Sequence, residues 1–309
     1  MPSLKRAINY ILHNRTQFMD SCIKNLGFMI PDKLYLSLRY RCIMGSWITW
    51  KNPQTFTEKL QWLKLYNRRP EYTKMVDKNA VKKYVANIIG EEYIIPTLGV
   101  WDKPEDIDWD SLPNQFVLKT THGGGGGGVV ICKDKTTFDK ASAIAKLKES
   151  MASDIYSGLR EWPYKNVPKR IIVEKFLAPE KSPDSVLKSS ELLDYKFFCF
   201  NGKVRFFKVD FGRFVEHHAN YYSPKGELLE FGEQGFEPDP NYPIELPNNL
   251  KEMISLAEKL SANVPFLRVD FYNLNGKIFF GELTFYPASG MIPWTTEEAD
   301  KEIGKYLKL

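Results

Sequence analysis

Residues Gln115–Asp134 read QFVLKTTHGGGGGGVVICKD, and this stretch decides the fold. Six consecutive glycines, Gly123–Gly128, lie between two short apolar runs, FVL before them and VVI after them. Glycine has no Cβ, so its backbone can reach positive φ and approach other groups closely. Short runs of this composition are typical of β-strands. The stretch therefore predicts a β-hairpin whose tip can turn backbone N–H groups toward a polyphosphate.

The residues after the glycines exclude two common nucleotide loops. A Walker A loop needs Lys-Ser or Lys-Thr and then a helix, and a dinucleotide fingerprint also needs a helix there, but Val-Val-Ile-Cys follows here. Three interpretations of the glycine stretch are left: an ATP-grasp loop, a protein-kinase loop and a flexible linker. Asp210-Phe211-Gly212 and Ala178-Pro179-Glu180 imitate kinase motifs. A kinase, however, needs H-R-D first and A-P-E last; this chain has no H-R-D, and its A-P-E comes first.

The composition is that of a globular protein with a real core. The chain has 309 residues, of which 43% are apolar and 14% aromatic. No run approaches 18 uncharged apolar residues, so we expect no transmembrane helix. The first residues lack the apolar core of a signal peptide. Four scattered cysteines, without a C-x-x-C motif, fit a reducing cytoplasm rather than a disulfide or metal framework.

The charge is concentrated at the N-terminus. Residues 1–70 hold 12 Lys/Arg and 3 Asp/Glu, whereas the whole chain has a net charge of +5. Such a segment suits an anionic partner, either a polysaccharide or a membrane surface, although a simple solvated basic face explains it equally well. Because no RNA-binding signature or zinc finger is present, we do not expect nucleic acid as a partner.

Local patterns predict a mixture of helices and hairpins. Helices are expected over residues 3–29, Thr57–Tyr66 with a threonine cap, Asp77–Ile89, Phe138–Met151, Leu250–Ser261 and Thr296–Lys308. Glu91–Pro96 is read as the start of a strand and Ile171–Leu177 as a buried strand. Two hairpins are expected around Asn201-Gly202 and Asn275-Gly276, a turn sequence typical of hairpins.

The second of these hairpins carries the candidate chemistry. In RVDFYNLNGKIFFGELTFYPASG, Asp270 leaves one strand and Glu282 leaves its neighbour. Pairing through the turn could bring both carboxylates to one face of the sheet. Mg²⁺ prefers one or two carboxylates together with phosphate oxygens and water. The pair therefore predicts Mg²⁺ held against ATP.

The order of these motifs resembles a known family. An Asp-Lys helix, Val-Leu-Lys, the glycine hairpin, Val-Glu-Lys-Phe-Leu and Arg-Val-Asp-Phe…Glu-x-Thr follow one another in the ATP-grasp order. From Asp32-Lys33-Leu34-Tyr35 onward the chain is similar to the TupA-like (teichuronopeptide-type) ATP-grasp family. The resemblance implies an α+β ATP-grasp fold, in which two α+β subdomains clasp ATP. It also implies a division into a helical basic segment, 1–70, and an ATP-grasp domain, 71–309, with a glycine-hairpin subdomain (about 101–175) and a metal-binding subdomain (about 176–309).

The resemblance also implies roles for individual residues. Lys78 and Lys119 match the phosphate-binding lysines, and Arg268 matches an arginine that steadies a carboxylate or acyl-phosphate. The expected contacts to ATP come from the glycine flap and the adenine hinge: His122, Gly124, Gly125, Gly126, Gly127, Glu174, Lys175, Phe176, Leu177 and Lys196. Asp270 and Glu282 match the Mg²⁺ ligands. Thr284 stands where the family usually has Asn, and a hydroxyl is a weaker ligand.

The function implied is an ATP-dependent carboxylate–amine ligase. Family members are tied to surface-polysaccharide synthesis, so the expected substrates are a uronic-acid carboxylate of a capsular polysaccharide or its precursor, and an amino acid or amino alcohol. Arg160, Trp162 and Arg213 are candidates for holding the acidic sugar, with ordinary packing as the alternative. A glycosyltransferase that uses a sugar nucleotide is the main rival, because Asp108-x-Asp110 resembles a glycosyltransferase metal pair; a carbohydrate-binding module is the second. The expected location is the cytoplasm, including the inner face of the membrane.

Overall fold

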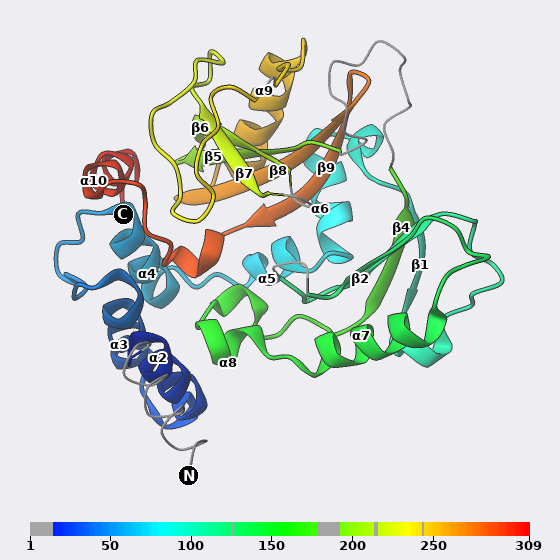
Figure 1. Cartoon of the computed structure of the whole chain (residues 1–309), viewed down its shortest axis with the longest axis horizontal. Coiled ribbons are helices and arrows are strands. Elements are labelled where there is room, and N and C mark those ends of the chain that lie inside the picture. Colours follow the sequence, from blue (N-terminus) through cyan, green and yellow to red (C-terminus); the bar gives the residue numbers. More distant parts are fainter. Residues whose placement is uncertain (1–14, 125–126, 178–191, 213–215, 243) are drawn as a thin grey trace.

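The protein is an α+β molecule built on two antiparallel sheets, as predicted (Figure 1). This computed structural model describes residues 15–124, 127–177, 192–212, 216–242 and 244–309. The smaller sheet has the strand order β1-β4-β2-β3 and the larger one β7-β6-β5-β8-β9. Figure 1 shows the larger sheet above the smaller one, with α6 between their right-hand parts.

The small sheet contains the predicted glycine hairpin. Its strands are β1 (Thr97–Trp101), β2 (Phe116–Thr120), β3 (Val129–Cys132) and β4 (Ile171–Lys175). The strands β2 and β3 pair from Phe116↔Cys132 to Lys119↔Val129, so the glycines form the connection between them. The helix α7 (Lys140–Ala152) covers this sheet, and Leu147 joins a small core with Phe116 and Leu118.

The large sheet contains both predicted Asn-Gly hairpins. Its strands are β5 (Asp194–Phe200), β6 (Lys203–Phe211), β7 (His218–Tyr222), β8 (Phe266–Leu274) and β9 (Lys277–Thr284). Both Asn-Gly pairs have positive φ, with Asn201 at 48° and Gly202 at 78°, and Asn275 at 52° and Gly276 at 81°. These values are those of a two-residue turn that matches the twist of paired strands.

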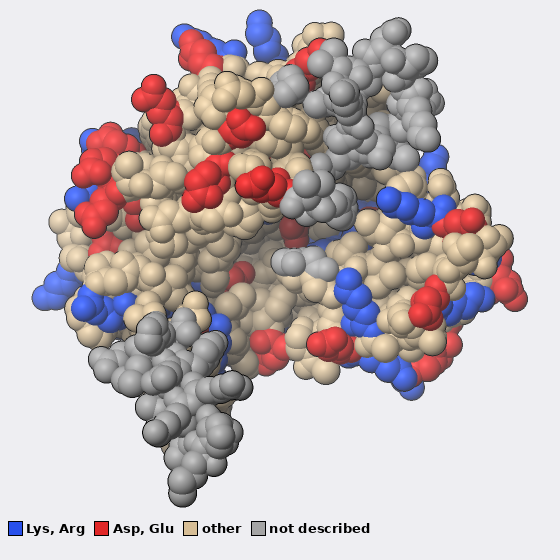
Figure 2. All heavy atoms as spheres, in the orientation of Figure 1, with Lys and Arg blue, Asp and Glu red and all other residues tan. Residues whose placement is uncertain are grey.

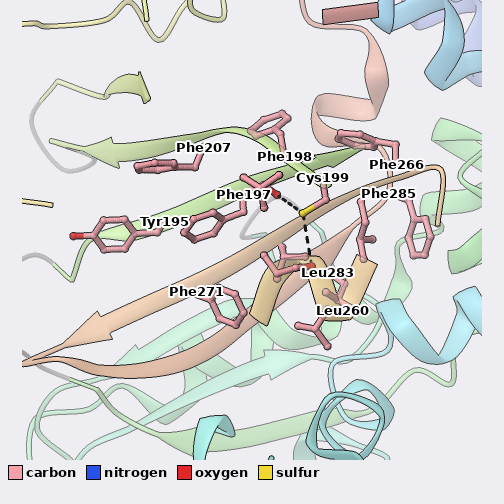
Figure 3. Close-up of a cluster of buried hydrophobic side chains, with 14 of the residues drawn as sticks. Tyr195, Phe197, Phe198, Cys199, Phe207, Leu260, Phe266, Phe271, Leu283 and Phe285 are labelled. Carbon is pink, nitrogen blue, oxygen red and sulfur yellow. Dashed lines mark hydrogen bonds between the residues drawn. The ribbon is translucent and has the colours of Figure 1, made fainter. Parts of the chain in front are cut away.

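The face of the large sheet that α9 covers is apolar and holds part of the main core. Alternate residues of a strand point to opposite faces, so Tyr195, Phe197 and Cys199 share the face covered by α9 (Leu250–Ser261). In Figure 3 the Cys199 thiol lies against α9, 3.8 Å from the Ala257 carbonyl. Phe197 and Phe207 stack with centroids 5.2 Å apart. The polar residues between them, such as Lys196, therefore belong to the opposite face.

The remaining elements surround the sheets. They are α2 (Arg15–Asn25), η1 (Gly27–Met29), α3 (Asp32–Met44), α4 (Phe56–Tyr66), α5 (Glu71–Val76), α6 (Ala80–Ile89), η2 (Glu91–Tyr93), η3 (Pro104–Asp106), α8 (Ile155–Leu159), η4 (Trp162–Tyr164), η5 (Pro287–Gly290) and α10 (Glu297–Tyr306). The helices α2 and α3 project from the body at the lower left of Figure 1. No helix of the described ranges has the length and apolar character that crossing a bilayer needs.

Several local expectations need correction. The cap of α4 is Thr55, which forms a capping box with Glu58, because Thr57 instead donates its hydroxyl to Asp300, 2.5 Å away. Asp77 is not in a helix. Its carboxylate accepts the Asn79 and Ala80 backbone N–H groups, and α6 begins only at Ala80.

Two further predicted elements differ from the structure, and two elements of the structure were not predicted. Glu91–Pro96 is a 3-10 turn followed by β1, since Gly90 at φ 117° ends α6 and the Ile94 N–H bonds back to Glu91. The described part of the helix predicted over 3–29 ends at Asn25, and its first residues lie outside the described ranges. The short helix α5 and the strand β7 were not predicted.

Candidate active site between the two sheets

Asp270 and Glu282 lie directly opposite each other on β8 and β9. The register shifts by one residue between Asp270 and Phe271, so that Gly281 forms a bulge. Without the bulge, Asp270 would pair with Gly281, and Glu282 would point to the opposite face, because side chains alternate along a strand. The expectation that the two carboxylates share a face is confirmed, but the bulge produces it.

Two cations hold Asp270 in place. Arg268 makes two parallel hydrogen bonds to its carboxylate, at 2.8 and 2.7 Å, and a third to the Thr284 hydroxyl at 3.0 Å. The Lys196 ammonium lies 3.3 Å from Asp270 and also pairs with Asp194. Burial raises the pKa of the Asp270 carboxyl, and Arg268 and Lys196 oppose only part of that shift. Burial would lower the pKa of Lys196, but its acidic neighbours outweigh it and raise it.

Lys78 joins the glycine hairpin to the carboxylate pair. Its ammonium donates to the Gly123 carbonyl at 2.5 Å and lies 3.1 Å from Glu282. Its backbone N–H also bonds the Thr121 carbonyl. Burial raises the pKa of Glu282, but Lys78 and Arg268 outweigh burial and lower it, so Glu282 is ionised at neutral pH. Lys78 thus contacts residues that both sheets contribute to the site: Gly123 after β2 of the small sheet and Glu282 on β9 of the large sheet.

Lys119 and Glu174 form a second ion pair on the small sheet. Lys119 lies 2.6 Å from the Glu174 carboxylate, which is buried and also pairs with Lys82. Lys82 further donates to the Ile95 carbonyl at 2.6 Å. Burial raises the pKa of Glu174, but the two lysines outweigh it and lower the pKa below its usual value.

His122 lies at the start of the glycine connection and is buried. Its Nε2 contacts the Ser150 carbonyl at 3.1 Å, an interaction that requires a proton on Nε2, and burial lowers its pKa. A neutral ring in this tautomer offers only an acceptor at Nδ1, so it does not suit a phosphate contact. Gly124 and Gly127 are exposed, whereas the predicted Gly125 and Gly126 lie outside the described residues.

Five of these charged side chains line one cleft. Figure 2 shows a hollow between the upper and lower lobes with acidic and basic atoms on its floor. The lining includes Lys78, Lys82, Lys119, Glu174 and Glu282 together with apolar side chains of α5, α6 and β9. Of the predicted hinge, Lys175 is exposed at the end of β4, and Phe176 and Leu177 follow half-buried.

Other predicted residues are placed elsewhere. Arg160 is buried: it pairs with Asp32 at 3.0 Å, donates to the Gly27 carbonyl and lies 4.2 Å over the Tyr35 ring. This gives Arg160 a structural role, so we no longer assign it to a sugar. Trp162 is half-buried in η4, and Arg213 lies outside the described residues.

The Asp108-x-Asp110 pair forms a local turn. One Asp108 oxygen accepts the backbone N–H groups of Asp110 at 3.2 Å and Ser111 at 3.4 Å, and both aspartates are exposed. This geometry is that of a capped turn. It gives the glycosyltransferase interpretation no support.

The sequence reasoning missed two parts of the site region. Lys82 could have been found, since it lies four residues after Lys78 in the helix predicted over Asp77–Ile89. Lys64 could not. Its buried ammonium donates to Ser289, in the turn after β9, and to the Leu159 carbonyl, at the end of α8. These bonds connect α4 to both segments. Those partners lie far away in the sequence.

The donor set fits a hard divalent cation shared with phosphate. Asp270, Glu282 and Thr284 offer only oxygen, as Mg²⁺ prefers. Within the described ranges, no group of three or more His, Cys, Asp or Glu side chains could hold a metal ion. Two carboxylates would leave most coordination positions of Mg²⁺ to water or phosphate oxygens.

The two antiparallel sheets face a cleft that is lined by lysines and carboxylates. This arrangement agrees with the ATP-grasp fold expected from the sequence. Comparison with family models gives a match to "TupA-like ATPgrasp" over residues 58–308. The chain belongs to the TupA-like ATP-grasp family, and its fold is the ATP-grasp fold. No curated protein matches it.

Solved structures of ligases are distantly similar. D-alanine–D-alanine ligase from Bacillus anthracis, complexed with ATP, is 18% identical, with 69% of this chain and 54% of that chain covered and a TM-score of 0.39. The Helicobacter pylori D-alanine–D-alanine ligase is 13% identical, with 82% and 69% covered and a TM-score of 0.42. The D-alanyl-alanine synthetase A from Vibrio cholerae is 16% identical, with 77% and 64% covered and a TM-score of 0.45. The chain thus spans about half of the first of these.

Proposed function

We propose that the protein is an ATP-dependent carboxylate–amine ligase that uses Mg²⁺. The observation that carries the proposal is the pairing of Asp270 with Glu282 beside Arg268, with Lys78 bridging from the glycine hairpin to Glu282. Membership of the TupA-like ATP-grasp family supports it.

The residues have distinct parts in this proposal. Asp270 and Glu282 would hold Mg²⁺, which would neutralise charge on the triphosphate. Lys78, Lys119 and the backbone N–H groups of the glycine hairpin would bind the phosphates. Placing positive charge and N–H dipoles where charge develops is the main source of catalysis in phosphoryl transfer. Glu174 to Leu177 would contact the adenosine.

The proposed reaction has two steps. A substrate carboxylate attacks the γ-phosphoryl group of ATP, which releases ADP and leaves an acyl-phosphate. An amine then attacks the acyl carbon, phosphate leaves, and the amine loses a proton to give an amide. Arg268, which lies beside Asp270 and Glu282, would steady the negative charge of the acyl-phosphate.

We propose a uronic-acid-containing surface polysaccharide or its precursor as the carboxylate substrate, and an amino acid or amino alcohol as the amine. The basic N-terminal segment supports this choice, and so does the resemblance to a family that is tied to surface-polysaccharide synthesis. Because ATP is the phosphoryl donor, we place the reaction in the cytoplasm. No described residue favours a glycosyltransferase, and the Asp108 turn gives that rival no metal site.

The test is release of ADP and phosphate from ATP, measured with uronic acids crossed with amines. We expect one class of pair to stimulate turnover in the presence of Mg²⁺ and not in excess chelator. Turnover of a nucleotide sugar without use of ATP would decide for the glycosyltransferase. Polysaccharide binding that survives Glu282→Ala, without any ATP turnover in the wild type, would decide for a binding module.

A further inference from the structure

The turn between α2 and α3 presents apolar side chains to solvent. Leu26, Phe28 and Met29 are 55%, 84% and 70% exposed, and Met19 and Leu34 on the flanking helices are 54% and 51% exposed. A single exposed apolar residue is ordinary, but a contiguous group marks an interaction surface. We call these five side chains the apolar tip.

The backbone of the apolar tip is fixed from inside. The buried Gly27 carbonyl accepts a hydrogen bond from Arg160, and a Cβ at Gly27 would come within 2.8 Å of the Tyr35 ring. The Met29 N–H bonds the Leu26 carbonyl at 3.0 Å, which closes the turn. The apolar side chains are therefore held outward by a backbone that packs on Tyr35 and Arg160.

The charge around the tip has one sign. Between residues 16 and 53 the exposed charged side chains are all basic: Lys24, Lys33, Arg41 and Lys51. The two acids of this range are in ion pairs with buried or half-buried arginines. Asp20 lies 2.7 Å from Arg39, and Asp32 lies 2.7 Å from Arg68 and 3.0 Å from Arg160. Lys24 also lies 2.8 Å from Asp20. The segment that carries the tip thus combines exposed apolar side chains with an excess of exposed basic side chains.

We propose that the apolar tip docks the protein on an anionic lipid surface. A surface-bound element buries its apolar side chains at the boundary between headgroups and acyl chains, while Lys and Arg beside it meet the anionic headgroups. The hairpin of α2 and α3 projects from the body (Figure 1), so its turn can enter a bilayer without obstruction by the sheets. A projecting apolar turn, unlike an apolar groove, suits a deformable lipid surface.

The tip is also connected to the cleft. Arg160, which holds Gly27, follows α8, and the last carbonyl of α8, that of Leu159, accepts a hydrogen bond from Lys64. Lys64 in turn bonds Ser289 in the turn after β9, the strand of Glu282. Docking through the tip would therefore hold the cleft at a fixed orientation to the membrane.

The experiment is sedimentation of the full-length protein with vesicles of phosphatidylcholine alone or mixed equally with phosphatidylglycerol. We expect binding to the anionic vesicles that weakens as salt is raised. The double variant Phe28→Ser/Met29→Ser should lower the partition coefficient by about tenfold or more, because two apolar side chains no longer enter the bilayer. The matched control is Ile131→Ser/Leu228→Ser, which changes side chains that are 45% and 42% exposed on other elements and should bind like wild type.

Three outcomes would overturn the proposal. They are equal binding by the tip variant and wild type, complete loss of binding when only residues 1–14 are removed, and a change of oligomeric state in the tip variant with unchanged vesicle binding. The last would assign the tip to a second copy of the chain. ATP turnover is measured in the same samples and should not change, so a failure of the ligase proposal leaves this test readable.

Discussion

Each carboxylate of the candidate site has a cationic partner from the chain itself. Glu282 pairs with Lys78, Asp270 with Arg268, and Glu174 with Lys119. The lysines that would bind a triphosphate thus neutralise the acids in this structure. A bound metal ion would take the place of a lysine or arginine beside an acid, and the nucleotide's phosphates would take the place of an acid beside a lysine. Because each acid is paired with a cation before the ligands bind, the free-energy cost of burying it stays low.

The first prediction concerns Glu282. We expect Glu282→Gln to lower ATP turnover by about 100-fold or more, because it removes one of the two facing carboxylates at the centre of the charge distribution. Its free energy of unfolding should change by about 1 kcal/mol or less, since its side chain is 34% exposed. The comparison is steady-state phosphate release together with urea unfolding.

The matched control for this variant is Glu258→Gln. Glu258 is 27% exposed and has a single lysine partner, Lys203, at 2.9 Å, so it resembles Glu282 in exposure and pairing but lies on α9. Equal turnover in the two variants would remove Glu282 from the site.

The second prediction concerns Glu174. It is buried and pairs with both Lys82 and Lys119, so Glu174→Gln leaves two lysines without their partner and should destabilise the protein by about 3 kcal/mol. The pKa of Glu174 is lowered below its usual 4.5 in the folded state. Its ionised form therefore stabilises the fold above pH 4.5, and that stability is lost as the pH falls through the folded-state pKa.

The pH dependence separates this effect from a simple packing defect. Urea unfolding at a series of pH values should show the two proteins converging in stability as the pH falls below 4.5. A constant gap between them across that range would show that the ion pairs are not the cause.

At the scale of elements, the bulge in β9 decides which face carries Glu282. The pairing runs Phe271↔Phe280 on one side of Gly281 and Asp270↔Glu282 on the other. A Cβ at Gly281 would lie 3.1 Å from the Asp270 carbonyl oxygen, a backbone atom that cannot easily move away. The glycine therefore permits the close approach on which the carboxylate pair depends.

The third prediction compares two glycines of this hairpin. Gly281→Ala should push Asp270 away from Glu282 and lower ATP turnover by about tenfold or more, because small displacements of catalytic groups are costly. Gly276→Ala has space around it but a φ of 81°, so it should cost about 1 kcal/mol of stability and leave turnover unchanged. Thermal unfolding and phosphate release on both variants make the comparison; equal turnover in both would show that the bulge does not set the site.

The hairpins themselves could be predicted from the sequence, and the bulge could not. Asn201-Gly202 and Asn275-Gly276 need positive φ at both positions, a local requirement that few residue pairs meet. The carboxylate pair was expected on one face, but the alternation of β9 alone places Glu282 on the wrong one. Nothing local to Gly281 distinguishes a bulge from regular pairing, because the constraint comes from the Asp270 backbone across the sheet.

The roles of charged residues were predictable only where a motif marked them. Lys78, Lys119 and Asp270 stand in recognisable positions, and all three line or adjoin the cleft. Arg160 was assigned to substrate from its basic, aromatic neighbourhood, yet it holds Gly27 and Asp32, more than 100 residues away in the chain. Lys64 escaped notice for the same reason, since its partners are remote in sequence.

At the scale of the whole molecule, α4 connects the N-terminal segment to the main core. Phe56, Leu60 and Leu63 belong to the same apolar cluster as the large sheet, and Thr57 is held by Asp300 of α10. The helices α2 and α3 instead pack in a separate small cluster, to which α3 contributes Tyr35, Leu36 and Tyr40. We therefore propose that the N-terminal segment ends before residue 55, rather than at the residue 70 expected from charge.

The last prediction tests that boundary with two truncated chains. Removal of residues 1–53 takes away most of the small cluster, leaving Met291 and Leu65, and keeps the main core intact. We therefore expect a folded protein with a lower melting temperature and measurable ATP turnover. Removal of residues 1–70 also takes Phe56, Leu60 and Leu63 out of the main core. Loss of a single such side chain costs about 2 to 5 kcal/mol, and the total stability of a domain is about 5 to 15 kcal/mol. The shorter chain should therefore fail to fold, which circular dichroism and calorimetry would show as the absence of a cooperative transition. A cooperative transition in the shorter chain would restore the boundary at residue 70 and make α4 part of the extension.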